Sequence, residues 1–426
     1  MSTIGVISLG CSKNLVDTER MLGMLKSAGH TFTEQPETAD VLIVNTCGFI
    51  ESAKQESINT ILEMAQYKKT GRCKTLVMTG CLSERYREDL SDALPEVDIF
   101  LGVREYEKLP ALLGAGAHAV CGSERVLTTP PYRAFLRIGD GCNNRCTYCA
   151  IPLIRGALHS VPMEDLVLEA EHLAEGGVTE LTVIAQDTSG YGKDLYDTPQ
   201  LIPLLQRLAK IDALHWIRVL YTYPDTVTPE LIRVLHDTPK LVPYLDMPLQ
   251  HINDALLARM NRRGSKAHIC RVLDTIRETA PDFILRTTMM VGFPGETDAQ
   301  FEELLSFLRD YPFDRVGAFS FSPEEGTKAA ALPDQIAEAV KQERLAALLS
   351  QQQAISKKKN LARIGTVAEV LIEGSDKKHT FGRSYAEAPD VDGRVILPYN
   401  ASLHAGDYTS VRFTQALEYD MIGETL

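Results

Sequence analysis

Three cysteines, Cys142, Cys146 and Cys149, lie in one short run with the spacing C-x3-C-x2-C. Three thiolates are one fewer than the four ligands that usually hold an iron–sulfur cubane or a structural zinc ion. A cubane held by three cysteines leaves one iron open to a ligand that is not protein. The nearest histidine downstream is His159, and it is not an evident fourth ligand for zinc. The spacing therefore favours a reactive iron–sulfur site over a zinc site.

Three further cysteines follow three predicted strands in the first part of the chain. Short apolar strands are expected at residues 4–9, 41–44 and 75–78. One cysteine follows each strand, usually beside a glycine: Cys11, Cys47 and Cys81. Because ligands bind at the carboxyl ends of the strands in open α/β sheets, these thiols should converge. An isolated cysteine is more often a small buried hydrophobe, but three such placements favour a second three-thiolate cluster site.

The predicted elements indicate an α/β chain that ends in a small β-barrel. Helical patterns alternate with the first three strands at 17–28, 51–68 and 83–94, which indicates a parallel α/β sandwich. After a linker at 128–132, six more strands separated by helical stretches are expected at 134–138, 180–185, 216–221, 243–247, 283–291 and 314–321. Six βα repeats are too few for a closed eight-fold barrel, so a partial (β/α)6 barrel is predicted. After a polar helix at about 333–360, short strands with glycine turns predict a small all-β barrel.

Length and composition set the broad class of the protein. The 426 residues suit three domains, which we expect at 1–125, 128–357 and 360–426. Lys and Arg number 44 against 57 Asp and Glu, so a net charge of −13 argues against a general nucleic-acid binder. We expect a cytoplasmic protein without a membrane segment, because no signal peptide and no apolar run of ~18 residues is evident. Nine cysteines in a reducing compartment indicate metal binding or catalysis rather than disulfides.

The C-x3-C-x2-C run, with Tyr148 before its last cysteine, resembles the radical S-adenosylmethionine (SAM) superfamily. In that superfamily the open iron binds the amino and carboxylate groups of SAM. One electron from the cluster then splits SAM into methionine and a deoxyadenosyl radical. The resemblance implies a [4Fe-4S] cluster on Cys142, Cys146 and Cys149, and a low-potential electron donor such as flavodoxin or ferredoxin.

The upstream cysteines resemble the N-terminal domain of the methylthiotransferases, and the C-terminal module is similar to their TRAM domain. The resemblance covers the whole chain and is strongest to the branch that modifies ribosomal protein S12. It rests on matching segments at 9–17, 44–50, 186–191, 248–251, 286–296, 322–326 and 382–386. One small departure is Ser12, where proline is often expected, and it leaves Cys11 untouched.

This resemblance implies a mechanism with two [4Fe-4S] clusters and SAM. A radical made at the first cluster takes a hydrogen from the β-carbon of one aspartate of S12. The second cluster, on Cys11, Cys47 and Cys81, supplies a sulfur that SAM has methylated, and the product is β-methylthio-aspartate. The residues expected near SAM are Tyr148, Gln186, Asp187, Gln250, Arg286 and Gly292.

Two of the residues expected near SAM could instead have a purely structural role. Asp187 could instead cap a strand end, and Arg286 could be an ion-pair partner. The remaining cysteines belong to no spacing pattern and are interpreted as non-ligands: Cys73, Cys121 and Cys270.

Two other functions are compatible with these cysteines. Methylthiotransferases that act on a modified adenosine in transfer RNA share the same cysteines, but a C-terminal domain that helps bind RNA should be basic. Residues 360–426 hold six Lys or Arg and ten Asp or Glu, a net charge of −4, which favours a basic ribosomal protein and makes direct RNA binding weak or secondary. The third possibility is a non-catalytic binding module with structural metal.

Overall fold

The computed structural model describes residues 1–114 and 125–426, so Cys121 lies outside the described residues. These residues form two compact units, which are described separately. The first unit comprises Met1–Pro130, Gly139–His159 and Ser322–Ala330, and the second comprises Pro131–Ile138, Ser160–Phe321 and Ala331–Leu426. The division into three domains stays a prediction.

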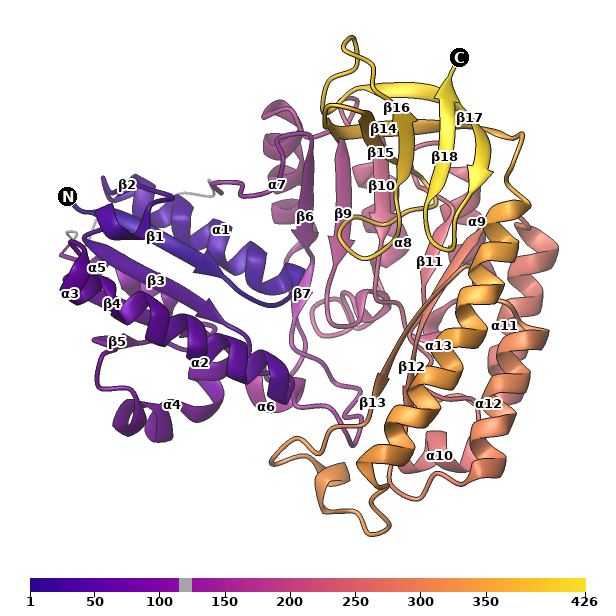
Figure 1. Cartoon of the computed structure of the whole chain (residues 1–426), viewed down its shortest axis with the longest axis horizontal. Helices are drawn as coiled ribbons and strands as arrows, with labels where there is room; N and C mark the ends of the chain where they lie inside the picture. The colour runs from indigo at the N-terminus through magenta and orange to yellow at the C-terminus, as the bar shows by residue number, and fades with distance from the viewer. Residues whose placement is uncertain (115–124) are drawn as a thin grey trace. The chain divides into compact units, whose positions relative to one another are not determined.

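The first unit is built on a parallel sheet with the strand order β2-β1-β3-β4-β5, as predicted from the alternating pattern (Figure 1). Its strands are β1 (Thr3–Ser8), β2 (Thr31–Phe32), β3 (Val41–Thr46), β4 (Thr75–Gly80) and β5 (Ile99–Phe100). Its longer helices are α1 (Ser12–Ser27), α2 (Glu51–Ala65) and α4 (Cys81–Ala93), and its short ones are α3 (Tyr67–Thr70), α5 (Leu109–Leu112) and α6 (Ile151–Ile154).

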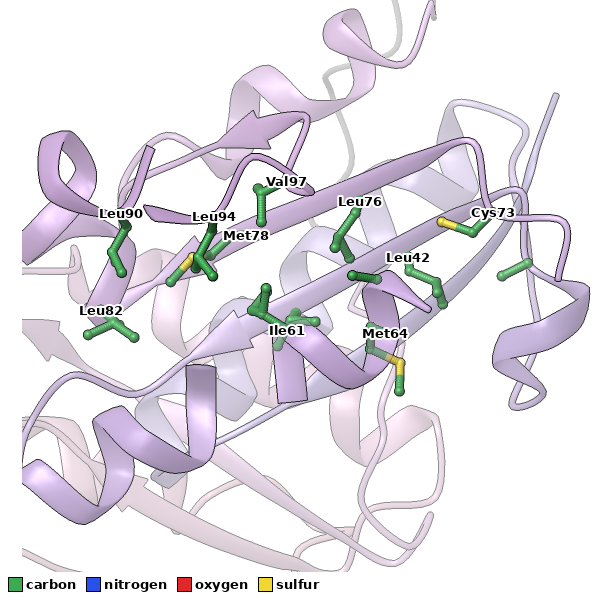
Figure 2. Packing of buried hydrophobic residues seen from close by; sticks show 13 residues of the cluster. Leu42, Ile61, Met64, Cys73, Leu76, Met78, Leu82, Leu90, Leu94 and Val97 are labelled. Atoms are coloured by element: carbon green, nitrogen blue, oxygen red, sulfur yellow. The ribbon is translucent and has the colours of Figure 1, made fainter. Parts of the chain in front are cut away.

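Alternation along the strands gives this sheet two apolar faces. Leu42 of β3 packs with residues of α2 and α4, whereas its neighbour Ile43 packs with residues of α1. Figure 2 shows the first of these cores, in which Ile61 of α2 and Leu90 of α4 lie over the strands. Cys73 lies in the same core with 5% of its surface exposed, as expected for a small hydrophobe rather than a ligand.

The second unit contains the six barrel strands that the sequence predicts. They are β6 (Arg133–Arg137), β9 (Glu180–Ile184), β10 (Trp216–Val219), β11 (Tyr244–Asp246), β12 (Ile284–Val291) and β13 (Arg315–Ser320). Two parallel three-stranded sheets, β6-β9-β10 and β11-β12-β13, are joined by a parallel bridge between Ile217 and Leu241. The predicted partial barrel is confirmed.

Helices alternate with the barrel strands, and several begin at a capping side chain. They are α7 (Met163–Glu175), α8 (Leu201–Leu208), α9 (Pro229–Asp237), α10 (Asp254–Arg259), α11 (Lys266–Thr279) and α12 (Asp298–Asp310). Thr297 and Gln300 form a capping box at the start of α12, which satisfies two backbone N–H groups there. Among the helices of the described ranges, none combines the length and the apolar character that crossing a membrane requires.

The chain ends in a closed barrel of five strands, and this confirms the predicted all-β module. The strands are β14 (Val367–Ser375), β15 (His379–Ser384), β16 (Val395–Pro398), β17 (Tyr408–Ala416) and β18 (Met421–Thr425), in the order β14-β15-β16-β18-β17. The long helix α13 (Glu338–Leu361) leads into this barrel and lies along β13 (Figure 1).

Ion pairs anchor the C-terminal barrel to the amino ends of the (β/α)6 strands. Glu180, Arg133 and Arg315 are the first residues of β9, β6 and β13. Each forms an ion pair with one residue from 383–392: Glu180 with Arg383 at 2.5 Å, Arg133 with Asp390 at 2.9 Å and Arg315 with Glu387 at 3.2 Å. In (β/α) barrels ligands bind at the opposite, carboxyl ends of the strands.

Candidate functional site

The first unit brings Cys11, Cys47 and Cys81 to one edge of its sheet. Cys11 immediately precedes α1, while Cys47 and Cys81 directly follow β3 and β4. The Cys11 thiol is exposed, that of Cys47 is half-buried and that of Cys81 is buried. A negative charge on either Cys11 or Cys47 would raise the pKa of the Cys81 thiol further, so the three groups lie close enough to interact.

Two glycines allow the backbones of these cysteines to approach each other. A Cβ atom added at Gly10, where φ is +91°, would lie 3.1 Å from the sulfur of Cys47. A Cβ atom at Gly48 would lie 3.0 Å from the carbonyl carbon of Cys81. Side chains at either position would therefore displace a cysteine.

Asn14, in the first turn of α1, ties the three strand ends together. Its Nδ2 donates to the carbonyl oxygens of Leu9 at 3.1 Å and Thr46 at 3.0 Å. Its Oδ1 accepts a hydrogen bond from the Cys81 thiol at 3.3 Å. One fully buried amide thus joins the loops of all three cysteines. Asn14 lies within a segment that matched the family, but its type and position alone did not indicate this role.

Burial governs the ionisation of the two inner thiols. Burial raises the pKa of Cys47, and it raises the pKa of Cys81 to about 12 although the nearby Arg155 charge acts in the opposite direction. The Ser57 hydroxyl also fixes Cys47, accepting from its N–H and donating to its carbonyl, both at 3.0 Å. Thiols held in this way become thiolates when a metal replaces their lost hydration.

The C-x3-C-x2-C run forms a loop of the same unit, and Cys142, Cys146 and Cys149 are half-buried in it. The N–H of Cys142 donates to the carbonyl of Gly156 at 3.1 Å, which closes the loop on its own exit. Gly141 has a φ of +75° and packs closely against the backbone of this closed loop. A Cβ atom at this position would lie 2.1 Å from a backbone oxygen. The glycine before the first cysteine is therefore required by geometry.

Arg155, at the end of α6, connects the two cysteine sets, and sequence reasoning did not identify it. Its Nη1 donates to both carboxylate oxygens of Asp140 at 3.1 Å. Its Nη2 donates to Asn14 at 2.6 Å and to Asp17 at 2.8 Å, and lies 3.8 Å from the Cys81 sulfur. The residue is 2% exposed, and no local periodicity marks it.

The segment Ser322–Ala330 also makes contacts near both cysteine sets. The sequence did not predict these contacts. The N–H of Ala329 donates to the carbonyl of Thr147, inside the cysteine loop, at 2.8 Å. Glu324 accepts from Arg85 at 3.1 Å, and the same guanidinium donates to the carbonyl of Gly48 at 3.1 Å. The only signal in the sequence was that residues 322–326 matched the family.

Among the residues expected near SAM, Tyr148 lies in the cysteine loop and the other five lie in the second unit. Gln250 is 8% exposed and has a φ of +71°. Its side-chain Oε1 is buried without a hydrogen-bond partner among the described residues. A buried amide oxygen without a partner is costly, so it marks a place where a ligand donor would fit.

Of the other residues expected near SAM in the second unit, Asp187 and Arg286 already have protein partners. Asp187 accepts from Gly190 N–H at 3.1 Å and caps the 3-10 turn η3 (Thr188–Gly190), which agrees with its structural alternative as a cap. Arg286 pairs with Asp246 at 3.0 Å and, more distantly, with Asp392 at 3.6 Å, which favours its ion-pair alternative. Gln186 is half-buried after β9, and Gly292 follows β12 with a φ of +70°.

The donor chemistry of both cysteine sets fits iron–sulfur clusters. Each set offers three thiols and no other ligand type, the composition of a cubane with one open iron. In the described residues, no three His, Cys, Asp or Glu side chains are placed to surround a single metal ion. In a cubane each thiolate binds a different iron, so its sulfurs stand farther apart than the ligands of one ion.

Three family models match the chain. The Uncharacterized protein family UPF0004 matches residues 3–102, the Radical SAM superfamily matches residues 136–308, and the TRAM domain matches residues 364–426. Together with the partial barrel and the C-x3-C-x2-C loop, these matches define a radical SAM enzyme, which uses SAM and an iron–sulfur cluster.

Curated relatives identify the family within this class. The chain is 46% identical to proteins named ribosomal protein uS12 methylthiotransferase RimO from Pelotomaculum thermopropionicum, over 99% of each chain, and from Thermoanaerobacter sp., over the whole of both chains. A protein of the same name from Clostridioides difficile is also 46% identical, over 100% of this chain and 99% of its own length. The chain belongs to the uS12 methylthiotransferase family.

Solved structures with low sequence identity share the fold. The radical SAM methyltransferase TsrM from Kitasatospora setae is 12% identical with a TM-score of 0.54, covering 75% of this chain and 74% of its own. The cobalamin-dependent SAM radical enzyme OxsB is 12% identical with a TM-score of 0.51, covering 84% of this chain and 56% of its own. At this identity the likeness concerns the fold alone.

Proposed function

We propose that this chain attaches a methylthio group to the β-carbon of an aspartate in ribosomal protein uS12. Similarity over the whole chain to proteins of that name supports the substrate. The observation that carries the chemistry is the second cysteine set, because generating a radical needs only one cysteine loop whereas inserting sulfur needs a second sulfur-bearing site. The names of the relatives do not favour the transfer-RNA alternative.

Two [4Fe-4S] clusters are the cofactors that this proposal requires in addition to SAM. Cys142, Cys146 and Cys149 would hold the first. The second would rest on the thiols at the strand ends: Cys11, Cys47 and Cys81. When bound, these groups and SAM would supply the electron, the radical and the methylated sulfur.

The chain's own residues hold this machinery in place. Asn14 fixes the strand ends that carry the second cysteine set, and Ser57 fixes the backbone of Cys47. The closure of the loop at Gly141 shapes the first set. Preorganised ligands of this kind bind a cluster without reordering the backbone.

For SAM, Gln250 is the contact that the geometry supports best. Its buried Oε1 lacks a partner among the described residues, and an amino or hydroxyl group of SAM could donate to it. Tyr148, Gln186, Asp187 and Gly292 remain proposed contacts. Arg286 is the weakest candidate, since two carboxylates already engage its guanidinium.

The C-terminal barrel offers an acidic surface to a basic ribosomal protein. Two of its carboxylates, Glu387 and Asp392, are buried in ion pairs, and so is Arg383. Others remain accessible, including Asp376 with 56% and Asp407 with 48% of their side chains exposed. This balance of exposed charges supports binding of uS12 rather than RNA. The proposed reaction takes place in the cytoplasm, where ribosomes work. A flavodoxin or a ferredoxin is the proposed electron donor.

Mass spectrometry of uS12 from cells that lack the gene tests the proposed function. We expect uS12 to lose the mass of one methylthio group, and the plasmid-borne gene to restore it. An aspartate that keeps its methylthio group in the deletion strain would overturn the proposal.

Cysteine substitutions separate the work of the two sets. Cys146→Ala should abolish SAM cleavage under dithionite, whereas Cys47→Ala should leave some SAM cleavage and no methylthio product. Cys270→Ala, a half-buried cysteine of α11 outside both sets, is the matched control and should keep both activities. Normal SAM cleavage in both of the first two variants would refute this division of labour.

A further inference from the structure

Arg155 places a positive charge beside the second cysteine set, although it belongs to the segment that carries the first. The segment Gly139–His159 contains both the C-x3-C-x2-C loop and Arg155. Ile154 of α6 and Ala150, the residue before this helix, pack against Cys81 and Val103, which brings the end of the helix to the strand edge. The guanidinium then lies 3.8 Å from the Cys81 sulfur and is 1% exposed.

The guanidinium is held in one orientation by partners on two sides. Asp140 binds Nη1, so Nη2 faces Asn14, Asp17 and the sulfur. Asn14 also contacts the Cys81 thiol, so arginine and cysteine share one acceptor at the site. Because Arg155 is a fixed, buried cation, its field on the sulfur is screened little by water or salt.

We propose that Arg155 is a positioning residue of the second cysteine set and that it stabilises negative charge on a cluster held there. Arg155 comes from the same segment of the chain as the first cysteine set. This inference rests on the proposed second cluster. Net charge, hydrogen bonds to sulfur and solvent exposure set the reduction potential of iron–sulfur clusters. A buried cation near one ligand sulfur therefore favours the reduced cluster, which carries one more negative charge.

The test measures the reduction potential of the second cluster alone. The full-length chain with Cys142, Cys146 and Cys149 replaced by alanine is reconstituted anaerobically with iron and sulfide. Its cluster is then titrated with dithionite, which supplies one electron per cluster, and followed by electron paramagnetic resonance. In this background we compare Arg155→Met, which removes the charge but keeps the length, with Arg155→Lys, which keeps the charge.

Two neighbouring variants sharpen the comparison. Asp140→Asn removes a negative charge from the far side of the guanidinium and should shift the potential in the opposite direction to Arg155→Met. Arg104→Met is the matched control, because this exposed arginine donates to the backbone carbonyl of Arg155, at 2.6 Å, and should leave the potential unchanged.

We expect Arg155→Met to shift the potential to a more negative value and Arg155→Lys to restore most of the shift. If Arg155→Met binds the full amount of iron and its reduction potential is unchanged, the proposed role of Arg155 is wrong. The proposal of a second cluster is not affected by that result. A background chain that binds no iron would overturn the second cluster itself, and the inference with it. If Arg155→Met binds no iron, the potential of Asp140→Asn decides, and no shift in that variant refutes the role.

Discussion

Replacing Glu180 should loosen the attachment of the C-terminal barrel to the (β/α)6 strands. Glu180 is fully buried at the start of β9 and accepts from Arg383 at 2.5 Å and Arg218 at 3.4 Å. Glu180→Ala would leave both arginines in the interior without this carboxylate. Removing one partner of a buried ion pair typically costs about 3–5 kcal/mol, because the charge left behind has lost its solvation and its partner.

The chain contains its own probe for this measurement. Trp216 is the single tryptophan, and it is 7% exposed at the start of β10. Its ring packs edge-on against Tyr408 of the C-terminal barrel, with centroids 5.0 Å apart. Tryptophan fluorescence during urea unfolding therefore reports on this interface. With an m-value of ~3 kcal/mol per M, the midpoint should fall by about 1–1.7 M.

A matched carboxylate provides the control. Glu164 pairs with Arg207 at 2.9 Å in the same unit, but 73% of its side chain is exposed. An exposed pair contributes at most ~1 kcal/mol, so Glu164→Ala should barely move the midpoint. If Glu180→Ala moves the midpoint no further than Glu164→Ala, the buried ion pairs do not secure the interface and the reasoning is wrong.

The same carboxylate predicts how stability depends on acid. Burial alone would raise the pKa of Glu180, but the charges of Arg383 and Arg218 outweigh burial and hold the pKa at about 2 instead of the usual 4.5. Because the folded pKa is depressed, this contribution is present above pH 4.5 and is lost as the pH falls toward 2. Glu180→Ala should remove this part of the acid dependence.

Three further substitutions test the local geometry. Gly141→Ala would place a Cβ atom 2.1 Å from the carbonyl oxygen of Ala157, so the cysteine loop should shift. The iron content after reconstitution should fall by the amount that one cluster holds. An iron content equal to that of the wild type would contradict this prediction. Burial raises the pKa of Glu296 from 4.5 to about 7, so the wild-type protein loses stability as the pH rises through that window. Glu296→Gln should therefore make the free energy of unfolding independent of pH between 4.5 and 7. A pH profile like that of the wild type would contradict this prediction. Thr297→Ala should cost about 1 kcal/mol in urea unfolding through the lost capping box with Gln300 while iron content is kept, and a normal midpoint would show that the cap contributes nothing.

Regular strands could be predicted because their signal is local. The apolar run Val41–Thr46 is fully buried, and its position followed from composition and flanking turns. Strands β15 and β18 carry a weaker local signal, because their short, mixed sequences become strands only through partners elsewhere in the closed barrel. The pairing that defines such strands is non-local, so periodicity carries little of it.

The same limit applies to the candidate site. The six cysteines stood out by spacing and by their place after strands, which are local properties. Arg155 did not, because its meaning depends on Asp17 and Asp140, which only the fold brings to it. Counting charges likewise could not show that Glu387 of the acidic C-terminal module is buried against arginines. Composition records how many charges exist and not which of them water reaches.

The hydrogen bond from Ala329 to Thr147 sets a time at which the cysteine loop can become organised during synthesis. Ribosomes release the N-terminal part of a chain first, so the loop emerges long before Ser322–Ala330. A nascent chain that ends before this segment presents its three loop thiols without the clamp. We therefore expect the cysteine loop to reach its final form, and to hold iron tightly, only after most of the protein has been made.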